Sequence, residues 1–183
     1  MVTSRKNGAQ RRDEILDAAL DCFVKNGVIA TGIEDIRKAA QASPSSIYHQ
    51  FDGIEDILIA LVDRIAAEQY AQLGEAAAAA KTFEAAVRGA VEALLAWTFA
   101  HEREARVIYQ AFAAELGPER KRLEAAKHGR RAPLEAAFAP WLAGTALASW
   151  SQLELSVLVF GATHAACRFY VTGQAIDPAW MRA

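Results

Sequence analysis

The stretch TGIEDIRKAAQASPSSIYHQF at residues 31–51 decides the fold. Thr31 and Glu34 have the spacing of a capping box, in which a hydroxyl and a carboxylate satisfy each other's backbone amides, so a helix is expected to begin at Thr31. Ser43 followed by Pro44 predicts a second helix start, because serine caps free amides and proline fits the first helical position. Two residues separate the helices. The stretch therefore predicts two short helices joined by a tight turn.

The residues on both sides of this stretch predict further helices. A helix running from about Arg11 to Asn26 is followed by Gly27, which suits a left-handed C-terminal stop. Asp52, with Glu55 three residues later, has the spacing of another capping box and predicts the start of a long helix. Together these elements predict a three-helix helix-turn-helix unit, whose second short helix can enter the major groove of DNA.

The outer face of the second short helix carries the candidate DNA contacts. Ile47 and Phe51 are four residues apart and can bury together, which turns the other side chains outward. Small hydroxyls let the backbone approach base edges, and a phenol or imidazole can donate to phosphate oxygens. The candidates on this segment are Ser43, Ser45, Ser46, Tyr48 and His49. The alternative for Tyr48 is that it only covers the core.

Net charge does not identify a partner. The chain carries 20 Lys and Arg against 22 Asp and Glu, and residues 1–53 contain seven of each sign. The position of the basic residues is more informative, because Arg5, Lys6, Arg11 and Arg12 precede the first helix as a basic arm that could reach DNA. A solvated arm is the alternative.

The composition predicts a folded, all-α chain. With 183 residues, 53% of them hydrophobic, the chain can form one or two small domains. No stretch alternates apolar and polar residues for long, so strands have little support. Further helices are expected at about residues 83–100, 103–116, 119–142 and 150–172, and Gly129 and Pro133 are expected to kink or split the third of these.

The sequence disfavours a membrane-spanning protein and a secreted protein. No apolar stretch reaches the roughly 20 residues of a membrane span, and the N-terminus lacks the apolar core of a signal peptide, so we expect a cytoplasmic chain without a membrane partner. Cys22 and Cys167 each lie among apolar residues, which favours buried thiols over a disulfide.

Polar residues on apolar faces of the later helices predict a small-molecule site, because such groups need partners once water is excluded. The candidate ligand-binding residues are Trp97, His101, Tyr109, Phe112, His164 and Arg168. Satisfied core histidines and ordinary aromatic packing are the alternative. His164 and Cys167 could share a metal ion, but a third ligand is missing nearby, so neither a metal nor a cofactor is expected.

Two further features of the later helices suggest surfaces. Gly161, Ala162, Ala165 and Ala166 are small residues that would let another helix approach closely, which suits a homodimer seam; packing within one chain is the alternative. A basic cluster is interspersed with glutamates and is most simply a solvated helix face, although an anionic effector or a protein could bind it. Its residues are Arg120, Lys121, Arg122, Lys127, Arg130 and Arg131.

Ten residues at these spacings resemble the DNA-binding domain of the TetR family of bacterial regulators: Phe23, Gly27, Thr31, Ile33, Ile36, Ala40, Ser43, Ile47, Tyr48 and Phe51. The resemblance covers about residues 11–63. It implies a helix-turn-helix domain at residues 1–53, followed by a helical ligand-binding and dimerisation domain at residues 54–183. The positions that it implies for contact with DNA are Thr31, Ser45, Tyr48 and His49.

Three features depart from the family pattern. Gln41 stands where the turn usually has a left-handed glycine. Ile54 stands where a lysine usually contacts phosphate, and acidic residues flank it at 52, 55 and 56. The family's further C-terminal helix is nearly absent, so a smaller dimer interface is expected, formed by residues 150–172 and Trp180. We expect modest DNA affinity that depends on Arg5, Lys6, Arg11, Arg37 and Lys38.

These features predict a ligand-responsive regulator that binds a pseudo-palindromic DNA operator as a homodimer until a small-molecule effector enters the bundle. The family resemblance implies that the regulator is a repressor. One alternative is a protein-binding module whose helix-turn-helix is weakened at Gln41 and Ile54. Another is a small helical enzyme or carrier that uses His101, Tyr109 and His164. Because the sequence offers no nucleophile with a base and no phosphate-binding glycine loop, enzymatic activity is not expected.

Overall fold

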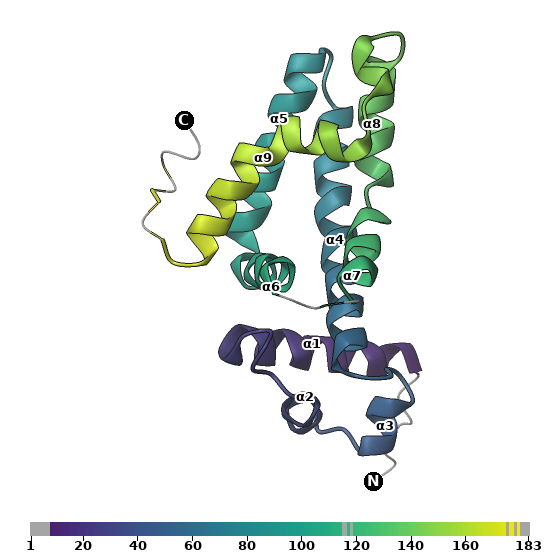
Figure 1. The fold of residues 1–183 in the computed structure, drawn as a ribbon, viewed down its shortest axis with the longest axis vertical. Coiled ribbons are helices and arrows are strands. Elements are labelled where there is room, and N and C mark those ends of the chain that lie inside the picture. The colour runs from purple at the N-terminus through teal and green to yellow at the C-terminus, as the bar shows by residue number, and fades with distance from the viewer. Residues whose placement is uncertain (1–7, 115–116, 118, 175, 178, 180–183) are drawn as a thin grey trace. The chain divides into compact units, whose positions relative to one another are not determined.

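The computed structural model describes residues 8–114, 117, 119–174, 176–177 and 179. All regular structure in this part of the chain is helical, which confirms the predicted all-α class (Figure 1). The elements are α1 (Gly8–Asn26), α2 (Ile33–Ala39), α3 (Pro44–Tyr48), α4 (Ile54–Ala78), α5 (Phe83–Ala100), α6 (Glu102–Ala113), α7 (Glu119–His128), α8 (Ala132–Leu142), the 3-10 helix η1 (Ala146–Ser149) and α9 (Gln152–Val171). Within the described ranges, none of these helices is long and apolar enough to cross a membrane.

The chain divides into two compact units. The described residues of Met1–Arg64 and Val107–Ala126 form the first unit, and those of Ile65–Arg106 and Lys127–Ala183 form the second. The first unit thus contains the predicted helix-turn-helix together with the start of α4 and residues 107–126. The predicted domains, with their boundary after residue 53, are a different division of the chain.

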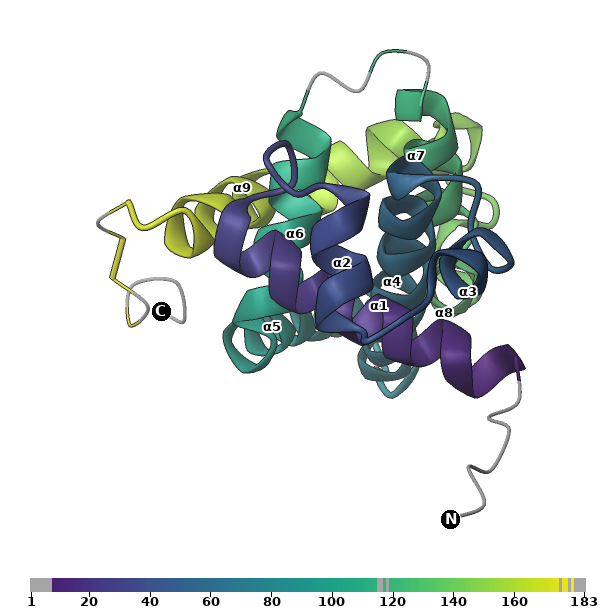
Figure 2. The same cartoon turned by 90° about the horizontal axis from the view of Figure 1, so that it is seen from below.

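The first unit is built around the apolar stripes of its helices. Ile15 and Phe23 of α1, Ile36 of α2 and Ile47 of α3 are each at most 1% exposed. Figure 2 shows α2 beside α1, and α3 beside the N-terminal end of α1. Gly27 has φ +84° and ends α1, as the sequence predicts.

Both predicted capping boxes are wrong in detail. Helix α2 begins at Ile33, with Gly32 as the N-cap, and the carboxylate of Asp35 accepts from the Gly32 N–H at 2.9 Å. Helix α4 begins at Ile54, and the Asp52 N–H donates to the Asp56 carboxylate at 3.2 Å. In both cases the carboxylate that binds the free amide lies one residue later than the predicted one. The Ser43 cap with Pro44 at the first position of α3 is confirmed.

In the second unit, α5 lies against α8 and α9 (Figure 1). Cys167 of α9 is fully buried, and the Thr98 hydroxyl of α5 lies 3.4 Å from its sulfur, while Cys22 in the first unit is also a buried free thiol. The predicted helix at 119–142 is split into α7 and α8, as Gly129 and Pro133 predict. Gly74 of α4 is closely covered, because a Cβ atom there would lie 2.7 Å from the carbonyl carbon of Pro133.

Candidate DNA interface and ligand pocket

Helix α3 presents a polar face to solvent. Its five residues bury Ile47, which is 1% exposed, and Phe51 follows at 4%. The Ser43 hydroxyl accepts from the Ser46 N–H at 3.2 Å and caps the helix. Tyr48 is 59% exposed, so it does not cover the core. The predicted contacts that lie exposed on this segment are Ser43, Ser45, Tyr48 and His49, and Ser46 is half-buried.

The turn before α3 contains the strained residue that the sequence pointed to. Gln41 has φ +47°, a left-handed conformation that costs a side-chain-bearing residue on the order of 1 kcal/mol. Two arginines bind the carbonyls of this turn. Arg11 donates to the carbonyl oxygens of Ala40 at 3.3 Å and Gln41 at 3.1 Å, and Arg37 donates to that of Ala42 at 3.2 Å.

Arg11 and Arg12 are residues of helix α1 and not of an extended arm, so that prediction is wrong for both. Arg11 also donates to the hydroxyl of Ser46 at 3.1 Å. Arg12 donates to the carbonyl of Gln50 at 3.0 Å, and its guanidinium carbon lies 4.3 Å from the centre of the Phe51 ring. Both side chains are therefore turned toward the α3 segment. The predicted arm residues Arg5 and Lys6 lie outside the described residues.

The remaining predicted DNA residues of the first unit have unequal exposure. Thr31 is 5% exposed, and its hydroxyl donates toward the carbonyl oxygens of Gly27 at 2.7 Å and Cys22 at 3.2 Å. It holds the end of α1 and is not available at the surface. Arg37 is half-buried and pairs with Glu34 at 2.8 Å, whereas Lys38 is exposed.

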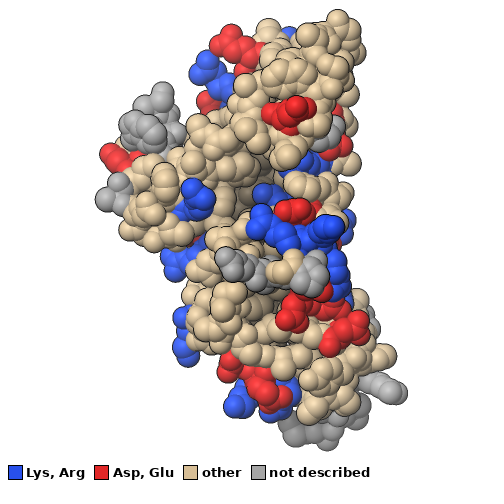
Figure 3. Space-filling view, in the orientation of Figure 1, with Lys and Arg blue, Asp and Glu red and all other residues tan. Residues whose placement is uncertain are grey.

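The acidic start of α4 is partly neutralised within the first unit. Arg122 pairs with Asp56 and, at 2.7 Å, with Glu119. The hydrogen bond from Arg122, followed by that from the Asp52 backbone, lowers the pKa of Asp56. On the face drawn in Figure 3, acidic and basic side chains lie close together at several places, and basic side chains gather near the middle.

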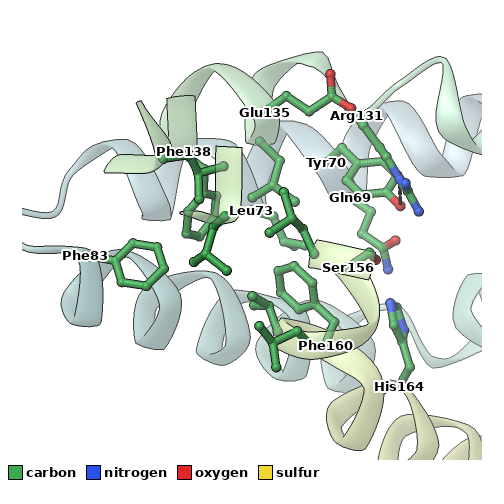
Figure 4. Close-up of a pocket in the computed structure, with 16 residues that line it drawn as sticks. Gln69, Tyr70, Leu73, Phe83, Arg131, Glu135, Phe138, Ser156, Phe160 and His164 are labelled. Atoms are coloured by element: carbon green, nitrogen blue, oxygen red, sulfur yellow. Dashed lines mark hydrogen bonds between the residues drawn. The ribbon is translucent and has the colours of Figure 1, made fainter. Parts of the chain in front are cut away.

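A cavity of about 90 Å³ lies in the second unit, between α4, α8, η1 and α9. Figure 4 shows that its two ends differ. Phe83, Phe138 and Leu73 lie toward one end, and Gln69, Arg131 and His164 lie toward the other. The Arg131 side chain donates to the Tyr70 hydroxyl at 3.2 Å at that polar end.

Positive charge gathers at the polar end. Burial, then Lys127 and Arg131, lowers the pKa of His164 to about 3, so its imidazole is neutral near pH 7. Burial, then Arg131, lowers the pKa of Lys127 to about 8. Lys127 and Arg131 are half-buried, so the solvated-face interpretation of the basic cluster is wrong for these two. A hydrogen-bond acceptor or an anion would be stabilised beside them.

Of the six predicted ligand-binding residues, His164 lines the cavity and the other five do not. Trp97, 1% exposed, stacks on His101 with 5.1 Å between ring centres, and His101 Nε2 lies 3.2 Å from the Glu68 carboxylate. Arg168 is exposed beside Phe169. The other two predicted residues, Tyr109 and Phe112, belong to the first unit.

Most residues that line the cavity are not among the predicted ligand-binding residues. Gln69 offered a signal, because it lies four residues from both Ile65 and Leu73 on the buried stripe of α4 and is itself 4% exposed. The other missed lining residues include Tyr70, Phe83, Phe138, Ser156 and Phe160, whereas Arg131 belongs to the basic cluster for which an anionic effector is the alternative. The apolar members of this set look the same in sequence whether they fill a core or line a cavity.

Residues 15–61 match the family model described as bacterial regulatory proteins of the tetR family. We call residues 15–61 the tetR-family segment, because the similarity to that family model is confined to them. The tetR-family segment runs from α1 into α4 and includes α2, the strained turn and α3. The HTH-type transcriptional repressor KstR2 of Rhodococcus jostii (strain RHA1) is 33% identical over 96 residues. That alignment covers 50% of this chain and 46% of KstR2, so the chain matches slightly less than half of that relative's length.

Solved structures share the fold beyond the tetR-family segment. The fatty acid degradation regulator FadR from Bacillus halodurans is similar with a TM-score of 0.77 at 18% identity, over 98% of this chain and 93% of that one. FadR from Bacillus subtilis, solved in complex with stearoyl-CoA, is similar with a TM-score of 0.75 at 18% identity, over 93% of each chain. At these identities the similarity establishes the fold.

Proposed function

We propose that this chain is a DNA-binding transcriptional regulator that represses until an effector enters the cavity of the second unit. The observation that carries the proposal is the exposed polar face of α3 on a helix-turn-helix of the tetR family. KstR2 is named a transcriptional repressor, which supports repression over activation. The proposal gives the chain no catalytic activity.

The proposed DNA contacts are the exposed polar residues: Lys38, Ser43, Ser45, Tyr48 and His49. The phenol and imidazole donate to phosphate oxygens, while the small hydroxyls allow α3 to approach base edges in the major groove. Lys38 supplies positive charge at the end of α2. Thr31 is not a proposed contact, because its hydroxyl donates to the backbone carbonyls of Cys22 and Gly27 at the end of α1.

Binding to duplex DNA from the region upstream of the chain's own gene tests this proposal, with fluorescence anisotropy as the readout. Lys38→Ala should weaken binding and make the slope of log K against log salt shallower by about one. Lys81→Ala is the control, because Lys81 is an exposed lysine outside the tetR-family segment. Absence of wild-type binding at low salt would refute the proposal.

We infer that the effector is an amphipathic molecule with an acceptor or anionic group. Arg131 offers donors at one end of the cavity, where Lys127 adds positive charge that acts on His164, and aromatic side chains line the other end. Because ligand pockets measure roughly 300–1,000 Å³, a cavity of about 90 Å³ must open before a ligand fits. Opening of the cavity would move the helices that line it, so a ligand that binds only the open conformation would favour that conformation over the closed one. The stearoyl-CoA bound by Bacillus subtilis FadR has this amphipathic character.

Titration calorimetry with stearate and with stearoyl-CoA tests the effector class. Arg131→Ala should weaken binding of the better probe by about tenfold, the loss expected for a charged hydrogen bond. Arg130→Ala is the matched control, because that arginine is exposed one residue away and does not line the cavity. Equal losses for the two variants, or no binding of either probe, would contradict this assignment.

We propose a homodimer seam on α9. Leu153, Val157 and Leu158 are each more than 60% exposed, and Trp150 just before the helix is 43% exposed. The small-residue stripe adds to this face, since a Cβ at Gly161 would meet only Val157 of its own helix, at 3.9 Å. Trp180 lies outside the described residues.

Light scattering should give a dimer for wild type and a monomer for Val157→Glu, and Glu154→Gln should remain dimeric; a monomeric wild type would refute the seam.

A further inference from the structure

Helix α3 cannot hold its own position. It has five residues and buries a single one of them, Ile47. Short isolated helices are marginal in water, because the cost of the first turn is not repaid by later hydrogen bonds. The turn that precedes α3 is also strained at Gln41. Contacts from outside the segment must therefore fix the geometry of its exposed face.

Two consecutive arginines of α1 supply these contacts at opposite ends of the α3 segment. At the near end, Arg11 binds the carbonyls of Ala40 and Gln41 and the hydroxyl of Ser46. Its remaining contact is with Glu14, at 2.9 Å, on its own helix. These contacts use all three nitrogens of the guanidinium, and the side chain is 20% exposed.

At the far end, Arg12 binds the carbonyl of Gln50 and lies over the ring of Phe51. A guanidinium suits both positions, because its planar fork can serve several acceptors at once and its face can stack on an aromatic ring. Lysine offers one compact ammonium group and can do neither in the same way. The charge of each residue is thus less important here than its shape.

We propose that Arg11 and Arg12 are positioning residues that hold both ends of α3 against α1 and thereby set DNA affinity without neutralising a phosphate. The inference rests on the proposed DNA-binding function. It replaces the expectation that the two residues belong to a basic arm on DNA. Arg37 assists from α2, where it binds the third carbonyl of the turn, that of Ala42.

The test uses Arg11→Lys and Arg12→Lys, which retain the charge and remove the fork. The probe is a labelled duplex selected by the wild-type chain from random duplexes. Each variant should bind about tenfold more weakly at fixed salt, with the wild-type salt slope. If these residues instead contact phosphate, the lysine variants keep their affinity, and Arg11→Ala makes the slope shallower by about one. That result would overturn the inference.

A second readout separates positioning from general loss of structure. Amide hydrogen exchange at Ile47 and Phe51 should accelerate in both lysine variants, while exchange in α9 remains as in wild type. Adding Gln41→Gly to Arg11→Lys should restore part of the affinity, because glycine accepts the turn conformation. Unchanged exchange or no restoration would overturn the inference. A wild-type chain that selects no duplex would overturn the proposed function as well, so the two failures are distinguishable.

Discussion

Replacing Gln41 by glycine measures the strain in the turn. A left-handed residue with a side chain costs about 1–2 kcal/mol, and the greater freedom of glycine in the unfolded chain offsets about 0.5–1 kcal/mol of the relief. The Gln41 side chain is exposed. The hydrogen bonds that residue 41 forms with the Lys38 carbonyl and the Arg11 guanidinium use its backbone N–H and carbonyl, which glycine retains. Gln41→Gly should therefore raise the free energy of unfolding by about 0.5–1 kcal/mol.

Urea unfolding followed by circular dichroism gives this free energy, and the melting temperature should rise by roughly 2–4 °C for each kcal/mol in a chain of this size. Ala39→Gly is the control, because Ala39 is an exposed residue of α2 with an ordinary helical conformation. It should lose up to about 1 kcal/mol. A Gln41→Gly chain no more stable than wild type would refute the argument from strain.

Three further substitutions test the packing. Gly74→Ala should lower the free energy of unfolding by about 1–3 kcal/mol, since its Cβ would collide with Pro133; an unchanged free energy of unfolding would contradict this. Thr31→Val should cost about 1–2 kcal/mol, because two carbonyls lose their donor, and Thr31→Ser should retain most of that stability. His164 has its pKa lowered to about 3, so the unfolded chain takes up its proton first and stability falls as the pH drops from about 6.5 toward 3. His164→Gln should remove about 1 kcal/mol of the loss between pH 7 and 5.5; an unchanged pH profile would contradict the burial of a neutral imidazole.

Local signals in the sequence located the helices well. Gly27 ends α1, Ser43 with Pro44 starts α3, and the second-unit helix α5 has the predicted bounds. These features depend on residues within one turn of each other, so the sequence displays them directly. The carboxylates in the two capping contacts lie one residue after the predicted ones: Asp35 binds the Gly32 amide and Asp56 binds the Asp52 amide. Each aspartate directly follows a glutamate, and the spacing alone does not rank the two.

Contacts between distant residues could not be predicted in the same way. Arg11 and Arg12 reach backbone carbonyls 29 to 38 residues away, and every residue carries a carbonyl, so the partner leaves no mark in the sequence. Both residues were therefore interpreted by charge alone. The cavity draws its lining from residues between 69 and 164, and only the fold places Gln69 near His164 (Figure 4).

The bound carbonyls of the turn link the evolutionary history of three positions. We expect a chain with glutamine at 41 to depend on the arginines at 11 and 37, which bind carbonyls of the turn, more than a chain with glycine at 41 does. The order of substitutions then matters: a glycine is lost at little cost once the arginines are present, and an arginine is lost at little cost while glycine remains. Among relatives of this chain, we expect the identity of residue 41 to vary together with that of residue 11.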